Sequence, residues 1–225
     1  NPNVPGSRFG SRALAGVGVA FYVMAAVRRE LEARGTAVMP PVTDFLDLVA
    51  LGTVADLVPL DVNNRVLVSQ GIRRIRAGRA VAGIRALLSI GQRNVAQLTA
   101  ADLGFAIGPR LNAAGRLDDM SIGIRCLLAD TVSEAVALAT RLDALNTERR
   151  EIEAKMQVAA LAAVRTLREP DADGPTRHGV CLFDASWHQG VVGLVASRIK
   201  DRVRRPVIAF ARAGDGALRG SARSI

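Results

Sequence analysis

Residues 131–170 read TVSEAVALATRLDALNTERREIEAKMQVAALAAVRTLREP and form the longest periodic stretch in the chain. The apolar residues recur at near-heptad spacing, and Thr131 and Glu134 form a capping box at the start. The pattern predicts one helix that ends by Pro170 and spans about 50 Å at 1.5 Å per residue. Because this length exceeds a small domain, we expect a connector between two lobes; a break near Asn146 is the alternative.

Arg149 lies on the apolar seam of this predicted helix. A helix that crosses between lobes in solvent explains this charge better than a buried coiled coil does. We therefore expect the Arg149 side chain to be exposed.

The chain before this stretch has a mostly helical pattern. The predicted elements are a helix over 13–32, an apolar element over 45–56 and a helix over 63–76. Thr99 and Asp102 form another capping box, and the helix that they begin is predicted to end at the Gly108–Pro109 pair.

The pattern changes after the long stretch, where residues 171–175 read DADGP and predict a linker. The elements predicted beyond it are a strand over 180–183, a helix over 189–203, a strand over 207–211, a turn over 214–216 and a strand over 218–224. We therefore predict an α/β protein in three parts: a mostly helical part (1–130), a connecting helix (131–170) and the beginning of a smaller α/β lobe (176–225).

Composition restricts the class of protein. With 225 residues, of which 49% are hydrophobic, the chain can build a core, and its net charge of +9 suits a partner rich in phosphate. Only Lys155 and Lys200 are lysines, so a coding bias toward arginine explains part of this charge equally well. Cys126 and Cys181 are too few and too far apart for a disulfide framework or a zinc site, which favours a reducing cytosol.

Neither end of the sequence resembles a natural terminus, and no stretch suits a membrane. The longest uncharged run, residues 13–27, is shorter than the roughly 20 residues that a bilayer span needs. The opening residues have neither an initiating Met nor a charged leader, and the last residues interrupt a strand-like run. We expect an internal piece of a longer cytoplasmic protein.

Asp56 is the first candidate functional residue, within the apolar segment ALGTVADLVPL at 50–60. A carboxylate in such surroundings has a high desolvation cost unless it is paired, hydrogen-bonded or bound to a metal. The alternative is a helix-terminal carboxylate that accepts backbone N–H bonds.

Arg110, Asn112 and Arg116 are the second group of candidates, in the segment GPRLNAAGRL at 108–117. Two guanidiniums and an amide on a loop with glycines can form a phosphate cradle, because Arg offers a planar fork of donors. The alternative is a local set of ion pairs with Asp118 and Asp119.

The third segment is WHQGVVG at 187–193, between a predicted strand and a predicted helix, where unpaired N–H groups favour an anion. Gly190 would let a phosphate approach, and His188 could donate to it. Trp187 could stack on a base or fill a seam between lobes. The fourth segment, GSARS at 220–224, offers Ser221 and Arg223, which would line the same cleft if it lay beside the third.

These four segments resemble the RecJ family in their order along the chain, as do NPN at 1–3 and GVGVAF at 16–21. The resemblance covers essentially the whole chain. It implies a DHH phosphoesterase lobe, a connecting helix and a DHHA1-type lobe that receives nucleic acid. It also implies a 5′-to-3′ exonuclease on single-stranded DNA in repair and recombination, dependent on Mn²⁺ or Mg²⁺ in a two-metal mechanism.

The resemblance also assigns roles to individual residues. Asp56 matches a catalytic metal ligand of the family. The residues that match substrate-binding positions are Arg110, Asn112, Arg116, His188, Gly190, Ser221 and Arg223. Partners of this family include single-stranded DNA and, as expectations for this protein, a single-strand-binding protein and a repair helicase.

One departure from the family pattern bears on activity. The early aspartates and the Asp-His-His motif, which supply the other metal ligands, are not in this sequence, and His178 and His188 are in the wrong lobe to replace them. We expect the remaining ligands to lie upstream of Asn1 and the 225-residue chain to be inactive by itself.

Three other functions remain open from the sequence. One is a related phosphoesterase that acts on short oligonucleotides, cyclic dinucleotides or pyrophosphate. Another is a non-catalytic scaffold of the same fold. The third is a basic helical module that binds single-stranded and duplex nucleic acid alike through charge, with an affinity that falls steeply with salt.

Overall fold

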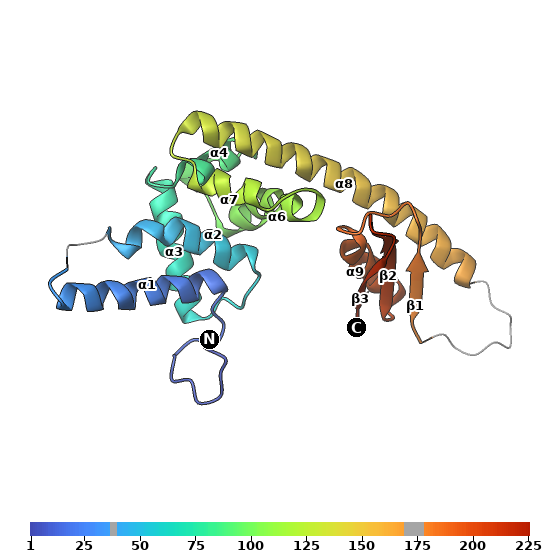
Figure 1. The fold of residues 1–225 in the computed structure, drawn as a ribbon, viewed down its shortest axis with the longest axis horizontal. Helices are drawn as coiled ribbons and strands as arrows, with labels where there is room; N and C mark the ends of the chain where they lie inside the picture. Colours follow the sequence, from blue (N-terminus) through green and yellow to red (C-terminus); the bar gives the residue numbers. More distant parts are fainter. Residues whose placement is uncertain (37–39, 169–177) are drawn as a thin grey trace. The chain divides into compact units, whose positions relative to one another are not determined.

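The computed structural model describes residues 1–36, 40–168 and 178–225, so the linker predicted at 171–175 lies outside the described residues. The chain divides into two compact units (Figure 1). Unit 1 comprises Asn1–Asn112 and Met120–Asp143, and unit 2 comprises Ala113–Asp119 and Ala144–Ile225.

All regular elements of unit 1 among the described residues are helices. Its elements are α1 (Gly16–Ala33), η1 (Val42–Phe45), α2 (Leu46–Ala55), α3 (Val62–Arg76), α4 (Ala82–Ile90), η2 (Val95–Gln97), α5 (Ala100–Asp102), the π-helix η3 (Leu103–Ile107), the first part of α6 (Gly108–Leu117), α7 (Ser121–Leu128) and the first part of α8 (Val132–Arg168). The helices predicted over 13–32 and 63–76 are confirmed as α1 and α3 within a few residues.

The core of unit 1 forms around α2, whose residues Val49, Ala50 and Leu51 are buried. Helix α3 crosses α2 closely at Gly71, where an added Cβ would lie 2.1 Å from the carbonyl oxygen of Leu46. No side chain fits at this crossing, so the two backbones can approach and bury their apolar faces.

The segment predicted to be a loop with glycines at 108–117 is instead helix α6, and that prediction is wrong. The capping box of Thr99 and Asp102 begins α5, as predicted, but the chain continues through the π-helix into α6 without a break. Pro109 directly follows the π-helix, where the regular backbone hydrogen-bond pattern is already interrupted, so its missing N–H is tolerated. The preceding π turn provides the irregularity that the Gly-Pro pair requires.

Helix α8 is continuous over 37 residues, so the break considered near Asn146 does not occur. Thr131 caps its first turn by accepting a hydrogen bond from the backbone N–H of Glu134 at 3.3 Å. At 1.5 Å per residue the helix is roughly 55 Å long. The expectation of an exposed Arg149 is wrong: its side chain is 13% exposed and forms an ion pair with Glu153, which one turn of helix brings to the same face.

Unit 2 contains a three-stranded sheet in the order β1–β2–β3, formed by β1 (Val180–Phe183), β2 (Val207–Arg212) and β3 (Leu218–Arg223). Strands β1 and β2 are parallel, and β2 and β3 are antiparallel. Helix α9 (Val192–Val203) connects β1 to β2, and a turn with Gly216 at φ +81° connects β2 to β3. All four elements agree with the sequence prediction within about three residues.

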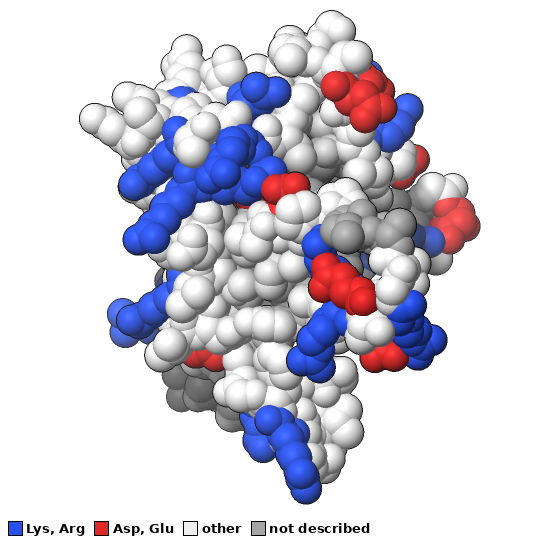
Figure 2. All heavy atoms as spheres, turned by 90° about the vertical axis from the view of Figure 1, so that its left-hand side faces the viewer, with Lys and Arg blue, Asp and Glu red and all other residues white. Residues whose placement is uncertain are grey.

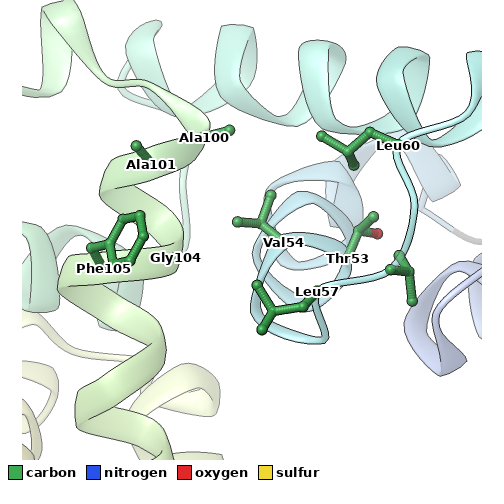
Figure 3. A pocket seen from close by; sticks show the side chains of 9 residues that line it. Thr53, Val54, Leu57, Leu60, Ala100, Ala101, Gly104 and Phe105 are labelled. Carbon is green, nitrogen blue, oxygen red and sulfur yellow. The ribbon is translucent and has the colours of Figure 1, made fainter. Parts of the chain in front are cut away.

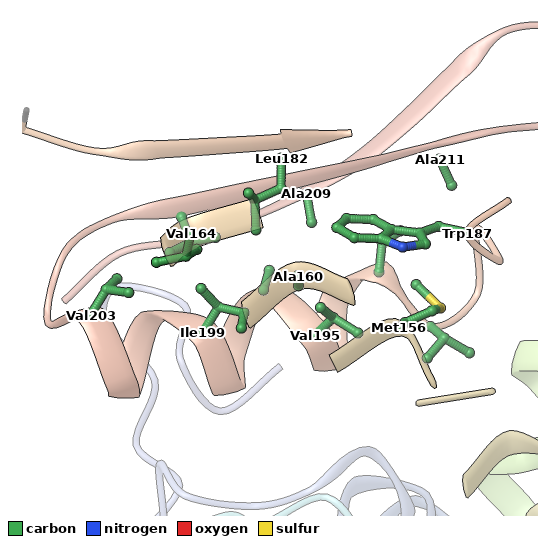
Figure 4. Close-up of a cluster of buried hydrophobic side chains, with 14 residues drawn as sticks. Met156, Ala160, Val164, Leu182, Trp187, Val195, Ile199, Val203, Ala209 and Ala211 are labelled. Carbon is green, nitrogen blue, oxygen red and sulfur yellow. The ribbon is translucent and has the colours of Figure 1, made fainter. Parts of the chain in front are cut away.

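The core of unit 2 lies between the sheet, α9 and the second part of α8 (Figure 4). Met156, Ala160 and Val164 from α8 meet Val195 and Ile199 from α9 in this cluster. The spacing of the α8 residues is that of one helical face, which explains why the second part of α8 is apolar on one side.

On the face displayed in Figure 2, the Lys and Arg side chains form several separate groups and outnumber Asp and Glu. Among the described residues, no helix combines the length and the apolar character that a bilayer span requires.

Candidate functional site

Asp56 lies at the C-terminal end of α2, where its backbone N–H donates to the Gly52 carbonyl at 3.0 Å. The next residue, Leu57, turns the chain with φ +56°. The carboxylate of Asp56 is exposed, and it has no hydrogen bond or ion pair within the part of the chain that the structure describes. A carboxylate at the negative end of a helix dipole is unfavourable unless a cation compensates it.

Two other aspartates of unit 1, Asp47 and Asp61, make hydrogen bonds that stabilise the fold, which distinguishes them from Asp56. The buried Asp47 accepts the backbone N–H of Val81 at 2.8 Å, at the start of α4. Asp61 caps α3: hydrogen bonds from the backbone N–H of Asn64 and the hydroxyl of Ser11 lower the pKa of Asp61. The hypothesis of a carboxylate that accepts backbone N–H bonds therefore fits Asp47 and Asp61 and does not fit Asp56.

A pocket of about 250 Å³ is lined in part by residues that flank Asp56 in the sequence, such as Val54 and Leu57 (Figure 3). In Figure 3, Phe105 of the π-helix lies on one side, and Val54 and Leu57 lie on the other. Phe105 is 79% exposed and Leu57 is 86% exposed, so the rim of the pocket is apolar and open. The polar side chain in its lining is Thr53, whose buried hydroxyl has no hydrogen-bond partner among the described atoms.

The first two candidates of the segment 108–117 differ in what their side chains do. The Arg110 guanidinium forms bonds of 2.9 and 2.8 Å to Asp143 and donates to the Ala106 carbonyl at 2.6 Å. These contacts occupy all three of its nitrogens and attach α6 to α8 within unit 1. Asn112 is exposed on α6. The ion pair of Arg110 is thus with Asp143, 33 residues later, rather than with a neighbouring aspartate.

Arg116 and Gly190 are neighbours in unit 2, although 74 residues separate them in the sequence. The Arg116 guanidinium donates to the Gly190 carbonyl at 3.2 Å. A Cβ on Gly190 would lie 2.0 Å from the carbonyl oxygen of Arg116, so only glycine fits there. The close approach of these two backbones therefore requires glycine at position 190.

His188 precedes α9 and is half-buried. Its Nδ1 accepts a hydrogen bond from the Gly190 backbone N–H at 3.1 Å. An accepting Nδ1 means that the neutral ring holds its proton on Nε2. His188 can therefore donate a hydrogen bond from Nε2 to an acceptor such as a phosphate oxygen.

Ser221 and Arg223 of β3 come together at the first turn of α9. A Cβ on Gly193 would lie 3.0 Å from both the Ser221 hydroxyl oxygen and Nη2 of Arg223. Arg223 Nη1 also donates to the Ser221 hydroxyl at 2.8 Å. A hydroxyl and an exposed guanidinium thus lie at the amino end of a 12-residue helix, which is a favourable arrangement for an anion.

Trp187 fills the core of unit 2. Its indole is buried beside Met156 (Figure 4), and Nε1 has no hydrogen-bond partner among the described atoms. In this position the ring cannot stack on a nucleotide base. The sequence suggested either base stacking or a place between two lobes, but the ring instead packs inside the core of unit 2.

Reasoning from the sequence missed a charged network in unit 2. Glu153 of α8 pairs with Arg149 on the same helix and with Arg198 on α9. The spacing of Arg149 and Glu153, four residues apart on a predicted helix, is the signal that could have revealed the first pair. No local pattern indicates the pair with Arg198, which is 45 residues away.

The candidates do not form a complete metal site. Within 1–36, 40–168 and 178–225, no group of three or more His, Cys, Asp or Glu side chains could hold a metal ion. Asp56 fits a role as one oxygen ligand, because its carboxylate is exposed and not used by the fold. Mg²⁺ and Mn²⁺ need further oxygen or nitrogen ligands, which these residues do not offer.

Comparison with known proteins gives a consistent answer. No family model matches the chain. The single-stranded-DNA-specific exonuclease RecJ of Dickeya dadantii is 58% identical over 231 residues, which cover 100% of this chain and 40% of that protein. The RecJ proteins of Escherichia coli and Bacillus subtilis are 55% and 34% identical, again over 100% of the chain, and the chain covers 40% and 27% of them.

Solved structures agree with these relatives. RecJ from Thermus thermophilus in complex with Mg²⁺ is 34% identical with a TM-score of 0.76, over 97% of this chain and 31% of that one. A structure of exonuclease RecJ bound to manganese is 35% identical with a TM-score of 0.75, over 92% of this chain and 48% of that one. The chain thus spans about 40% of the length of the Dickeya dadantii and Escherichia coli proteins, and by its sequence and fold it belongs to the RecJ family.

Proposed function

We propose that the protein containing this chain is a metal-dependent exonuclease that degrades single-stranded DNA from the 5′ end in repair and recombination. The observation that supports this most directly is the 58% identity, over the whole chain, to a single-stranded-DNA-specific exonuclease. The net charge of +9 also suits a substrate with one negative charge per nucleotide.

In this proposal Asp56 supplies one ligand of a site for Mn²⁺ or Mg²⁺. Its support is the exposed carboxylate without a partner in the described chain, at the end of a helix where a cation would stabilise it. Two such cations, when bound, would activate a water molecule and stabilise charge on the scissile phosphate. Ligands beyond Asp56 would come from outside these 225 residues.

The residues of unit 2 would bind the phosphates of the substrate. Ser221, Arg223 and the first turn of α9 offer a hydroxyl, a guanidinium and backbone N–H groups to one phosphate. His188 would donate a hydrogen bond from Nε2, and its orientation is set by the hydrogen bond from Gly190. These groups orient the strand and do not themselves perform the chemical step.

The residues of α6 would have two different roles. Asn112 and Arg116 would contact the DNA backbone, because Asn112 is exposed and Arg116 has donors beyond the bond to Gly190. Arg110, whose three nitrogens are engaged, would hold α6 in position instead of contacting DNA. A single-strand-binding protein and a repair helicase remain proposed partners, and the cytoplasm the proposed location.

The test of this function uses Asp56→Asn in the full-length protein, with Asp130→Asn as the matched control. Asp130 is also an exposed carboxylate of unit 1 without a partner in the described chain. We expect Asp56→Asn to lower the rate of Mn²⁺-dependent release of mononucleotides from labelled single-stranded DNA by at least about 100-fold. Binding of the DNA in EDTA should remain within about twofold of wild type, and the control should behave as wild type. Full activity of Asp56→Asn would refute the metal-ligand role.

The substrate and the direction can be tested with the same wild-type protein. Single strands blocked at either end and duplexes of the same length are incubated with Mn²⁺. Hydrolysis is expected to stop when the 5′ end is blocked and to be slow on duplex DNA. The 225-residue chain alone is expected to release no mononucleotides, and progressive release by it would contradict the assignment of missing ligands to other parts of the protein.

A further inference from the structure

Glu153 is a buried carboxylate that bridges two helices of unit 2. Its side chain is 7% exposed, and one oxygen accepts from Nη1 of Arg149 at 2.6 Å. The other oxygen accepts from Nε of Arg198 on α9. Arg149 also donates from Nη2 to the buried side-chain oxygen of Asn146 at 3.1 Å. Each oxygen of the carboxylate thus holds a different guanidinium.

The surroundings of this carboxylate contain more positive than negative charge. Burial is the main cause that lowers the pKa of Arg149, and the attraction of Glu153 opposes it. Repulsion from the guanidiniums of Arg116, Arg150 and Arg198 lowers this pKa further. Three other guanidiniums and one carboxylate therefore interact electrostatically with Arg149, so positive charge is in excess around it.

The bond that Arg198 makes to Glu153 leaves most of its donors available. It uses Nε alone, no other hydrogen bond of Arg198 occurs among the described residues, and its side chain is 57% exposed. The two terminal nitrogens therefore keep their donors free of partners among the described residues, in the fork that fits two oxygens of a phosphate. Arg116 likewise has donors that its single bond to Gly190 does not use.

The charge excess has a physical consequence. A simple structural ion pair needs one guanidinium for each carboxylate, and the Arg149–Glu153 pair already satisfies this. Additional guanidiniums beside it repel one another unless an anion lies between them or water screens them. A nucleic-acid phosphate is an anion of the right charge and shape.

We propose that Arg198, held by Glu153, is a further phosphate-contacting residue of unit 2 in addition to Arg116, and that the buried Arg149–Glu153 pair is its positioning support. This inference rests on the proposed function, because it takes the phosphate to belong to single-stranded DNA. It adds Arg198, Glu153 and Arg149 to the residues through which the protein would recognise its substrate.

The test measures DNA binding by the full-length protein without hydrolysis. A fluorescein-labelled oligothymidylate is titrated in EDTA, and its anisotropy is followed over a range of salt concentrations. The variant is Arg198→Ala, and the matched control is Arg165→Ala. Arg165 is an exposed arginine on α8, roughly 18 Å along the helix axis from Glu153 at 1.5 Å per residue.

Loss of one phosphate contact should be visible in two quantities. We expect Arg198→Ala to weaken binding roughly three- to tenfold at low salt and to reduce the slope of log K against log salt by about 0.7, the value for one contact to a single strand. Arg165→Ala should bind as wild type. Arg198→Lys, which keeps the charge without the fork, should restore the slope and only part of the affinity.

The outcomes separate this inference from the function on which it rests. Equal affinity and equal slope for wild type, Arg198→Ala and Arg165→Ala would overturn the inference and leave the proposed function intact. Failure of the wild-type protein to bind the oligothymidylate would overturn both. Because Arg198 is on the surface, its variant is expected to fold, and circular dichroism verifies this before binding is measured.

Discussion

Replacement of Glu153 by glutamine is expected to destabilise unit 2 by about 3 kcal/mol, since it leaves the guanidinium of Arg149 buried without an opposite charge. The side chains of this pair are 7% and 13% exposed, so water compensates little of the loss. The second partner contributes less: Arg198 is 57% exposed, and its removal should cost at most about 1 kcal/mol. The two substitutions therefore differ in cost although they disrupt bonds to the same carboxylate.

The assay is urea unfolding of the 225-residue chain, followed by the fluorescence of Trp187. This is the single tryptophan of the sequence and it is buried in the core of unit 2, so its emission reports the unfolding of that unit. With a urea m-value of about 2 kcal/mol per M, Glu153→Gln should lower the midpoint by about 1.5 M. Arg198→Ala should lower it by less than about 0.5 M.

A double variant tests the cause. Arg149→Met together with Glu153→Gln removes both buried charges, and we expect it to recover most of the stability lost by Glu153→Gln alone. A Glu153→Gln midpoint equal to that of Arg198→Ala, or a double variant less stable than either single one, would refute the reasoning that an unpaired buried charge determines the cost.

Three further outcomes follow from the geometry. In the same urea assay, Gly190→Ala should destabilise unit 2 by more than about 2 kcal/mol, because its Cβ would lie 2.0 Å from a backbone oxygen of α6. The control is Gly214→Ala, whose Cβ would meet nothing within 4 Å, and it should cost less than about 1 kcal/mol. Burial raises the pKa of Cys126 to about 11, so a thiol reagent at pH 8 should modify the exposed Cys181 in the native chain and both thiols only in urea. Hydrogen bonds, first of all from a backbone N–H of α3, lower the pKa of Asp61. The stability that the Asp61 carboxylate contributes is therefore present above its unfolded-state pKa of about 3.9, and it is lost as the pH falls toward the lower pKa of the folded state. Asp61→Asn should thus reduce the difference in thermal stability between pH 7 and pH 3, and an unchanged difference would contradict this assignment.

Most of the secondary structure was predictable because it depends on neighbours in the sequence. The capping boxes at Thr99 and Thr131 and the apolar periodicity of α8 involve residues within one or two turns of each other. The strands of unit 2 follow the same logic, because a run of β-branched residues ending in a turn is a local feature. The similarity to the RecJ family was equally accessible, since it resides in the order of short segments.

The errors arose where the sequence context was ambiguous. Gly108 and Pro109 commonly end a helix, yet a proline at the first turn of a helix is equally compatible, and the π turn before it decides between these outcomes. Burial of the Arg149 guanidinium on an apolar seam costs free energy when it is unpaired and is tolerated when a carboxylate pairs with it. The prediction of an exposed Arg149 left out its pairing with Glu153.

The sequence alone indicated the family, most of the helices and strands, and the candidate side chains for binding metal or phosphate. It could not determine which of those side chains the fold already uses. Asp47 and Asp56 lie nine positions apart in one apolar segment, but the partner of Asp47 is Val81, 34 residues away. Only the tertiary structure shows that contact, because hydrogen bonds depend on distance in space, and it shows that Asp56 has no such partner among the described residues.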